Sequence, residues 1–176
     1  MCKNKLHLFN IYNKSLLWGQ LDSRIIVHKI KPMFKDDINY IEINLEKIQS
    51  FDESFISTVF INLIKSIKKS GKELVFVFSN PANEEIIVQL SSIFLTKNIF
   101  SILKRDTGIE IIGDASYLKK IIFKNIHEHK EINPVSISKE FNKPFKSCKS
   151  EFEEFVSIGL LEKENDEIYK TNLSFV

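Results

Sequence analysis

One stretch of the sequence limits the possible folds of this chain more than any other. Residues 51–67 read FDESFISTVFINLIKSI, and from Phe55 onward their apolar side chains recur at the spacing of one helix face. Asp52 is placed to cap the start of this helix, because carboxylate oxygens accept bonds from the free N–H groups there. Strand-like runs stand on either side, at 40–45 and 73–79. The order strand, helix, strand predicts a parallel pair joined by a right-handed crossover.

The opposite side of this predicted helix is mostly polar. At about 100° per residue, the side chains that follow one another along it are Ser54, Thr58, Ile61 and Lys65. Ile61 is the apolar member of this row, and we predict that it faces water. The row is therefore a candidate surface for a protein partner, although a single exposed apolar side chain is also ordinary in proteins without a partner there.

The rest of the N-terminal part predicts alternating strands and helices. The expected elements, in order, are strands at 6–12 and 15–18, a helix at 21–31, a strand at 40–45, the helix at 51–67, a strand at 73–79, a helix at 82–95 and a strand at 108–113. The first two strands would form a hairpin that turns at Asn13-Lys14. Asp22 or Ser23 would cap the first helix, and Pro32 would end it. Residues 96–107 carry no clear pattern.

The pattern changes after residue 114. The expected elements are a helix at 115–130, a short extended piece at 132–135, a helix at 136–141, a helix at 145–157, and two strands on either side of a turn at 164–167. Ser136 would cap the second of these helices, and Gly159 would end the third. This succession of helix, strand, helix, turn, helix and hairpin is typical of a winged helix-turn-helix domain.

Charge is also unevenly distributed in this C-terminal part. Residues 114–150 contain eight lysines against four acids, and residues 151–176 contain two lysines against seven acids. The net charge of the whole chain, +2, hides this division into a basic and an acidic segment.

The order of elements over about residues 6–125 resembles that of the STAS domains (sulfate transporter and anti-sigma-factor antagonist) and of the related STAS-like domains. Anti-sigma antagonists have Asp-Ser-Ser-Gly at the head of the helix that begins here with Asp52-Glu53-Ser54-Phe55, and a partner kinase phosphorylates their second serine. Ser54 falls on that serine, whereas Glu53 and Phe55 depart from the motif. Ser23-Arg24 looks more like the STAS-like relatives. The resemblance implies a protein-interaction domain with Ser54 as a candidate phosphorylation site; the alternative is that Ser54 satisfies backbone donors at the helix start.

The segment 155–162, FVSIGLLE, resembles the end of the recognition helix in many winged-helix transcription regulators. Together the two resemblances predict an α/β fold: a STAS-like domain at 1–114 with a mixed, mostly parallel sheet, and an α+β winged helix-turn-helix domain at 115–176. The helix at 115–130 would belong to both domains as a rigid joint.

The resemblance implies that the helix at 145–157 enters the major groove of duplex DNA. Lysines and hydroxyls suit phosphates and base edges, so the candidate DNA-binding residues are Lys143, Lys146, Ser147, Lys149 and Ser150. Acidic side chains nearby count against DNA, because phosphates repel them; they are Glu151, Glu153, Glu154, Glu164, Asp166 and Glu167. The alternative is therefore a protein-interaction adaptor that uses both domains.

The sequence carries no motif of an enzyme, a metal site or a membrane protein. No GxSxG, HExxH, GxGxxG or P-loop is present, and the two cysteines, Cys2 and Cys148, do not form a CxxC. His127 and His129 point to different sides of their predicted helix, so we expect no metal and no cofactor. Without a signal peptide or a long apolar run, the expected location is the cytoplasm. A homodimer is a further expectation, because winged-helix regulators often read paired half-sites.

Overall fold

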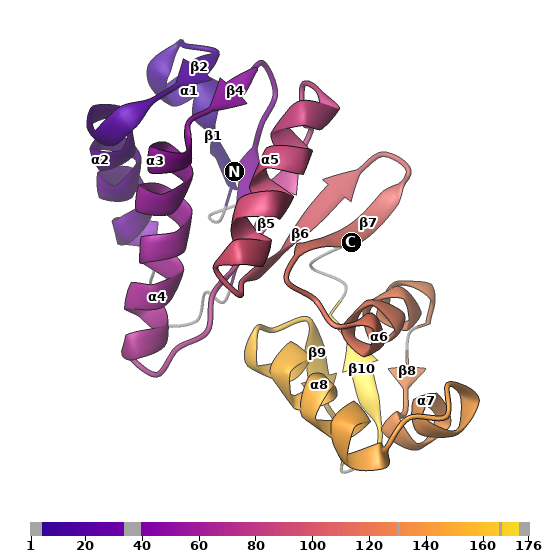
Figure 1. Ribbon diagram of the computed structural model, residues 1–176. Helices are drawn as coiled ribbons and strands as arrows, with labels where there is room; N and C mark the ends of the chain where they lie inside the picture. The colour runs from indigo at the N-terminus through magenta and orange to yellow at the C-terminus, as the bar shows by residue number, and fades with distance from the viewer. Residues whose placement is uncertain (1–4, 34–39, 130, 166, 173–176) are drawn as a thin grey trace. The chain divides into compact units, whose positions relative to one another are not determined.

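The computed structural model describes residues 5–33, 40–129, 131–165 and 167–172. The chain divides into two compact units, Met1–Asp114 and Ala115–Val176, each built around a sheet of its own (Figure 1).

The first unit has a five-stranded sheet in the order β1-β3-β5-β6-β7. Its strands are β1 (Lys5–His7), β3 (Tyr40–Asn44), β5 (Val75–Ser79), β6 (Phe100–Arg105) and β7 (Gly108–Gly113). The first four strands run parallel, and β7 returns antiparallel to β6. A separate parallel pair joins β2 (Leu16–Leu17) to β4 (Ser50–Phe51). The predicted mixed, mostly parallel sheet is confirmed.

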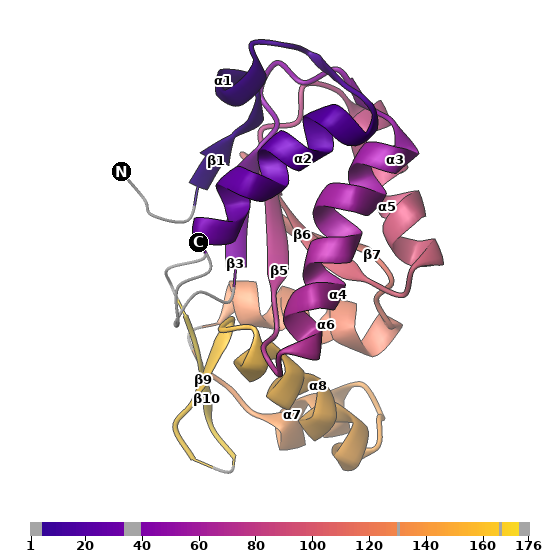
Figure 2. The same cartoon turned by 90° about the vertical axis from the view of Figure 1, so that its left-hand side faces the viewer.

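Helices cover one face of this sheet (Figures 1 and 2). They are α2 (Gly19–Ile30), α3 (Glu53–Ile56), which continues through a π-helical turn (Ser57–Ile61) into α4 (Asn62–Lys69), and α5 (Glu84–Thr96). Phe60 lies at the centre of the core beneath them, edge-on to Phe76 and Phe78 of β5, with ring centroids 5.0 and 5.1 Å away. The helix predicted at 51–67 is therefore the central helix of this unit.

The predicted hairpin at 6–18 is wrong. Residues 8–12 form a short helix, α1 (Leu8–Tyr12), whose Leu8 is fully buried. Asn13 ends it in the left-handed conformation, at φ 53°. The strands before and after α1 pair with different partners, β1 with β3 and β2 with β4. A short apolar run is compatible with either a strand or a helix, and here pairing with distant strands decides between them.

The predicted caps of α2 are also wrong. The helix begins at Gly19, so Asp22 and Ser23 lie in its first turns and are buried. The carboxylate of Asp22 accepts a bond from the Trp18 N–H at 3.3 Å, and the Ser23 hydroxyl donates to the Gly19 carbonyl at 3.0 Å. Pro32 falls in a 3₁₀ turn (η1, Lys31–Met33) that extends the helix.

Asp52 caps its own helix, as predicted, and a second helix as well. One carboxylate oxygen accepts from the Phe55 N–H at 2.6 Å, and the other accepts from the Gly19 N–H at 2.8 Å. One side chain thus satisfies free N–H groups at the starts of both α3 and α2, which lie side by side in Figure 2.

The prediction that Ile61 faces water is wrong, because Ile61 is only 2% exposed. A π-helical turn holds more residues than an α-helical turn. It lets Val59, Phe60 and Ile61 face the core in succession. Ser54 and Lys65 are exposed and Thr58 is half-buried, so the four residues of the predicted row do not form a continuous exposed surface.

The stretch 96–107, which had no predicted structure, completes α5 and forms β6. The hairpin of β6 and β7 ends at Gly113, whose φ is +84°. A Cβ at this position would lie 2.5 Å from the Ile99 carbonyl oxygen and 2.7 Å from the Phe94 Cβ. Glycine is therefore required here both by conformation and by space.

The described residues of the second unit form three helices and a small antiparallel sheet in the order β8-β10-β9. In chain order its elements are α6 (Tyr117–Glu128), β8 (Glu131–Ile132), α7 (Pro134–Glu140), α8 (Phe145–Ser157), β9 (Leu161–Lys163) and β10 (Tyr169–Thr171). This is the predicted order of a winged helix-turn-helix domain, and α8 has the predicted bounds. Residue 130, the expected last residue of the first helix, lies outside the described part.

The cap of α7 and the exposure of α6 differ from a simple helical pattern. Asn133, not Ser136, caps α7 by accepting a bond from the Val135 N–H at 2.7 Å, with Pro134 in the first helical position. Tyr117, in the first turn of α6, is 71% exposed. The buried face of α6 instead includes Lys119, whose ammonium group has acidic partners on α8.

Candidate nucleic-acid interface

The N-terminal half of α8 presents a basic and hydroxyl-bearing face. Lys146, Ser147 and Ser150 are exposed, and Lys149 is half-buried. The opposite face of the helix is fixed in the core by Cys148, Phe152 and Phe155, all fully buried. Because the buried side chains determine how the helix is turned about its axis, the lysines and serines point outward.

The turn that leads into α8 is closed by a reciprocal pair of hydrogen bonds. The Ser138 hydroxyl donates to the Lys143 carbonyl at 2.6 Å, and the Lys143 N–H donates to the Ser138 carbonyl at 3.0 Å. Asn142 makes the turn possible with a φ of 49°. The Lys143 ammonium group lies 5.8 Å from the centre of the Tyr117 ring, a cation–π contact. These contacts hold Lys143 next to the first turn of α8.

The first turn of α8 has no side-chain cap. The Ser147 and Cys148 N–H groups donate to the Pro144 carbonyl, at 3.0 and 3.1 Å. The N–H groups before them in the helix have no acceptor within the described chain, and the positive end of the helix dipole lies at the same place. The lysine face therefore adjoins a helix end that favours negative charge.

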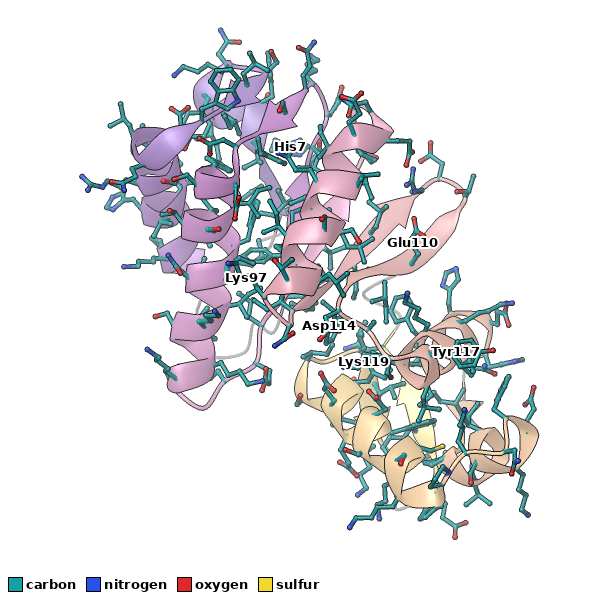
Figure 3. The ribbon with its side chains drawn as sticks, viewed as in Figure 1. His7, Lys97, Glu110, Asp114, Tyr117 and Lys119 are labelled. Atoms are coloured by element: carbon teal, nitrogen blue, oxygen red, sulfur yellow. The ribbon has the colours of Figure 1, made fainter. Side chains whose placement is uncertain are left out.

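The acids that follow on α8 are engaged within the unit. Lys119 of α6, labelled in Figure 3, lies 2.8 Å from Glu154 and 3.5 Å from Glu151, and the Ser116 hydroxyl donates to Glu151 at 2.9 Å. Glu153 accepts bonds from the Tyr169 hydroxyl at 2.8 Å and from Lys163 at 3.2 Å. These acids therefore hold α8 against α6 and the hairpin.

The contacts of Glu153 change its acidity. The hydrogen bond from the Tyr169 hydroxyl, with a smaller contribution from Lys163, holds the pKa of Glu153 below its ordinary value. Glu153 is thus ionised throughout the neutral range, and its charge is partly offset by the Lys163 ammonium group.

The hairpin remains acidic on its outer side. Glu164 pairs with Lys170 at 2.7 Å, and this hydrogen bond raises the pKa of Lys170. Glu162 and Glu167 are exposed, and Asp166 lies outside the described residues. Of α8 and the hairpin, it is therefore α8 with the turn before it that presents a basic surface.

Ser54 lies in the first turn of α3, exposed to solvent. The capping role that was the alternative for Ser54 belongs to Asp52. The Ser54 hydroxyl makes no hydrogen bond within the part of the chain that the structure describes, so its position differs from that of an N-cap serine.

Within the described residues, no three or more His, Cys, Asp or Glu side chains gather as they would around a metal ion. None of the helices described is both long enough and apolar enough to cross a bilayer. No protein-family model matches the chain, and comparison with curated proteins gives no significant match.

Sequence reasoning missed the residues that engage the acids of α8. Lys119 stands three residues before Ile122 and four before Phe123, on the buried face of α6. Glu151 and Glu154, three residues apart, lie on one face of α8. A lysine on an apolar helix face and two acids at helical spacing were a signal for an ion pair, although the sequence did not show that they would meet.

Proposed function

We propose that this chain is a DNA-binding regulator, in which the second unit contacts duplex DNA through α8 and the first unit binds a protein partner. The observation that carries the DNA proposal is the division of charge on α8. Its acids are held by Lys119, Lys163 and Tyr169, whereas Lys146 has no ion pair among the described residues.

The basic surface fits the phosphate backbone and the bases in different ways. Residues 141–150 contain three lysines and no acid. Lys143 and the open start of α8 suit a phosphate, whereas the outward side chains of Lys146, Ser147 and Ser150 are those that a helix in the major groove presents to base edges. Direct contact with DNA would be made by α8 and the turn before it rather than by the acidic hairpin.

The test is the affinity for a labelled mixed-sequence duplex, measured by fluorescence anisotropy at several salt concentrations. We expect the double variant Lys146→Glu/Lys149→Glu to lose binding and the single variant Lys146→Gln to lower the slope of log K against log salt by about one. Lys124→Glu/Lys120→Glu is the matched control, because it makes the same change of charge on exposed positions of α6. Unchanged affinity in the α8 variant would refute the proposal.

A protein-interaction adaptor is the second candidate, and the acidic hairpin favours it. If the hairpin approached DNA, the phosphate backbone would repel the carboxylates of Glu162 and Glu167. If the protein binds no duplex DNA at low salt, that result supports the hypothesis of a protein-interaction adaptor. The homodimer expected for paired half-sites is tested by sedimentation with and without a palindromic duplex; a monomer in both would contradict it.

Ser54 is the proposed phosphorylation site of the first unit. It is exposed at the start of a helix, where the dipole favours negative charge. A phosphoryl group would also stand two residues from Asp52, whose carboxylate joins the starts of α2 and α3. Phosphorylation would thus weaken that junction by repulsion. Intact-mass analysis after expression in the native cell tests the site; a chain unmodified at Ser54 would contradict it.

A further inference from the structure

The outer face of α2 carries a row of exposed apolar side chains at its start. Trp18 is 58% exposed, Leu21 73% and Ile25 41%. Leu21 and Ile25 are four residues apart and so lie along one edge of the helix, and Trp18 precedes them as the extended N-cap residue. The inner face is fixed by Ile26 and Ile30, both fully buried, so that the helix cannot turn these side chains inward.

The exposed area of this row is that of a substantial apolar patch. From their exposed fractions, the three side chains present roughly 300 Å² of mainly apolar area, which is within the range of the largest patch on a typical monomer. Patches of that size often mark an interaction site. The spacing of four residues between Leu21 and Ile25 is also one by which a helix anchors itself in a groove of a partner.

The exposed charges on α2 itself are of one sign. Arg24 and Lys29 are exposed on α2 and have no ion pair among the residues described. Asp22 is the only acid between residues 14 and 31, and it is buried against Lys14. A second copy of the chain would bring basic side chains against basic side chains, which disfavours a symmetric contact here.

The row lies close to the start of α3. The Gly19 N–H, next to Trp18, is bonded to Asp52 at 2.8 Å, and Figure 2 shows the start of α2 beside α3. Ser54 follows Asp52 by two residues. A molecule that covers the row therefore comes near the candidate phosphorylation site.

We propose that the outer face of α2 docks an acidic amphipathic segment of a partner protein. Apolar side chains of that segment cover Trp18, Leu21 and Ile25, and its carboxylates meet Arg24 and Lys29. A bilayer fits less well, because Ile26 and Ile30 hold the inner face of the helix in the core, so that its whole apolar surface cannot turn toward the lipid. The inference rests on the protein-binding role proposed for the first unit and names its surface.

Trp18 is the only tryptophan of the chain, so its fluorescence reports directly on this face. The probe is a designed helical peptide of about 18 residues, five turns, with leucines on one face and glutamates on the other. We expect a saturable blue shift of the emission that weakens as salt is raised. The same peptide with lysines in place of glutamates gives no shift.

Three variants separate this surface from a general affinity for peptides. Leu21→Glu is expected to weaken binding by roughly tenfold or more, because it introduces a like charge. Val88→Glu, at an exposed apolar position of α5, leaves the affinity unchanged. Arg24→Gln/Lys29→Gln removes the salt dependence, because it leaves the glutamates of the peptide no opposite charge.

Any of four results overturns the proposal. They are no shift with the acidic peptide, an equal shift with the basic peptide, an equal shift with vesicles of phosphatidylserine and phosphatidylcholine, or a shift caused by self-association as the concentration is raised. The Lys146→Glu/Lys149→Glu variant should bind the peptide normally, and Leu21→Glu should bind DNA normally. Failure at this surface is therefore distinguishable from failure of the DNA proposal.

Discussion

Replacement of Lys119 by methionine tests the arrangement on which the DNA proposal depends. The Lys119 side chain is 11% exposed and lies 2.8 Å from Glu154 and 3.5 Å from Glu151. Methionine fills a similar space without charge, so the variant leaves two carboxylates unpaired where α6 meets α8. Such a loss costs several kcal/mol when both partners are buried.

The expected cost is smaller here because Glu154 is partly exposed and can turn toward water. We expect the second unit to lose about 2 kcal/mol of stability. This corresponds to an increase of about 30-fold in the hydrogen-exchange rates of those α8 amides that exchange through unfolding of the unit. The released carboxylates also bring negative charge to α8, so the affinity for duplex DNA should fall as well.

Hydrogen exchange read by mass spectrometry locates the effect on α8. Lys124→Met is the control, because Lys124 is exposed and its distance to Glu128 is 3.8 Å; its effect on exchange should be small. Adding Glu154→Gln to Lys119→Met should restore part of the protection. If the α8 amides of Lys119→Met exchange as slowly as those of Lys124→Met, the ion pairs of Lys119 do not stabilise α8 and the prediction is wrong.

Three further outcomes follow from single side chains. Ser101→Ala should raise the stability of the first unit by about 1 kcal/mol, because the Ser101 hydroxyl is fully buried and has no hydrogen-bond partner among the described residues; a lower urea midpoint by tryptophan fluorescence would contradict this. Asp52→Ala should lower the stability of the first unit by about 2 kcal/mol, measured by the same urea midpoint, because one carboxylate caps two helix starts. Asp52→Asn should cost less. The lowered pKa of Glu153 stabilises the second unit fully above about pH 4.5, and this stabilisation is lost as pH falls through the lowered pKa. Replacing Tyr169 by phenylalanine should therefore reduce the loss of stability on acidification, as measured by circular dichroism between neutral and acid pH, and an unchanged acid response would count against the Tyr169–Glu153 bond.

Patterns among neighbouring residues were sufficient to predict those helices and strands whose conformation depends on their own residues. The helix at 145–157 was predicted with its observed bounds, because Cys148, Phe152 and Phe155 recur on one face and Gly159 follows its end. The strand–helix–strand core was found for the same reason, with Asp52 as the cap. Hydrophobic period and capping are properties of neighbours in the chain, and a single sequence displays them.

The remaining features depend on contacts between residues far apart in the chain. The segment 8–12 became a helix because the strands on either side of it found parallel partners more than thirty residues away. Ile61 turned inward through a π-helical turn over the phenylalanines of β5, which the regular helical period did not indicate.

The sequence by itself determined the class of fold, the identity of α8 as the lysine-bearing helix, and the acidic side chains that follow on it. Only the tertiary structure decided that those acids are held by Lys119 and Tyr169, and that Trp18, Leu21 and Ile25 are left in solvent. The physical reason is that charge and hydrophobicity belong to a residue, whereas their pairing and their burial depend on which distant residues the fold brings beside it.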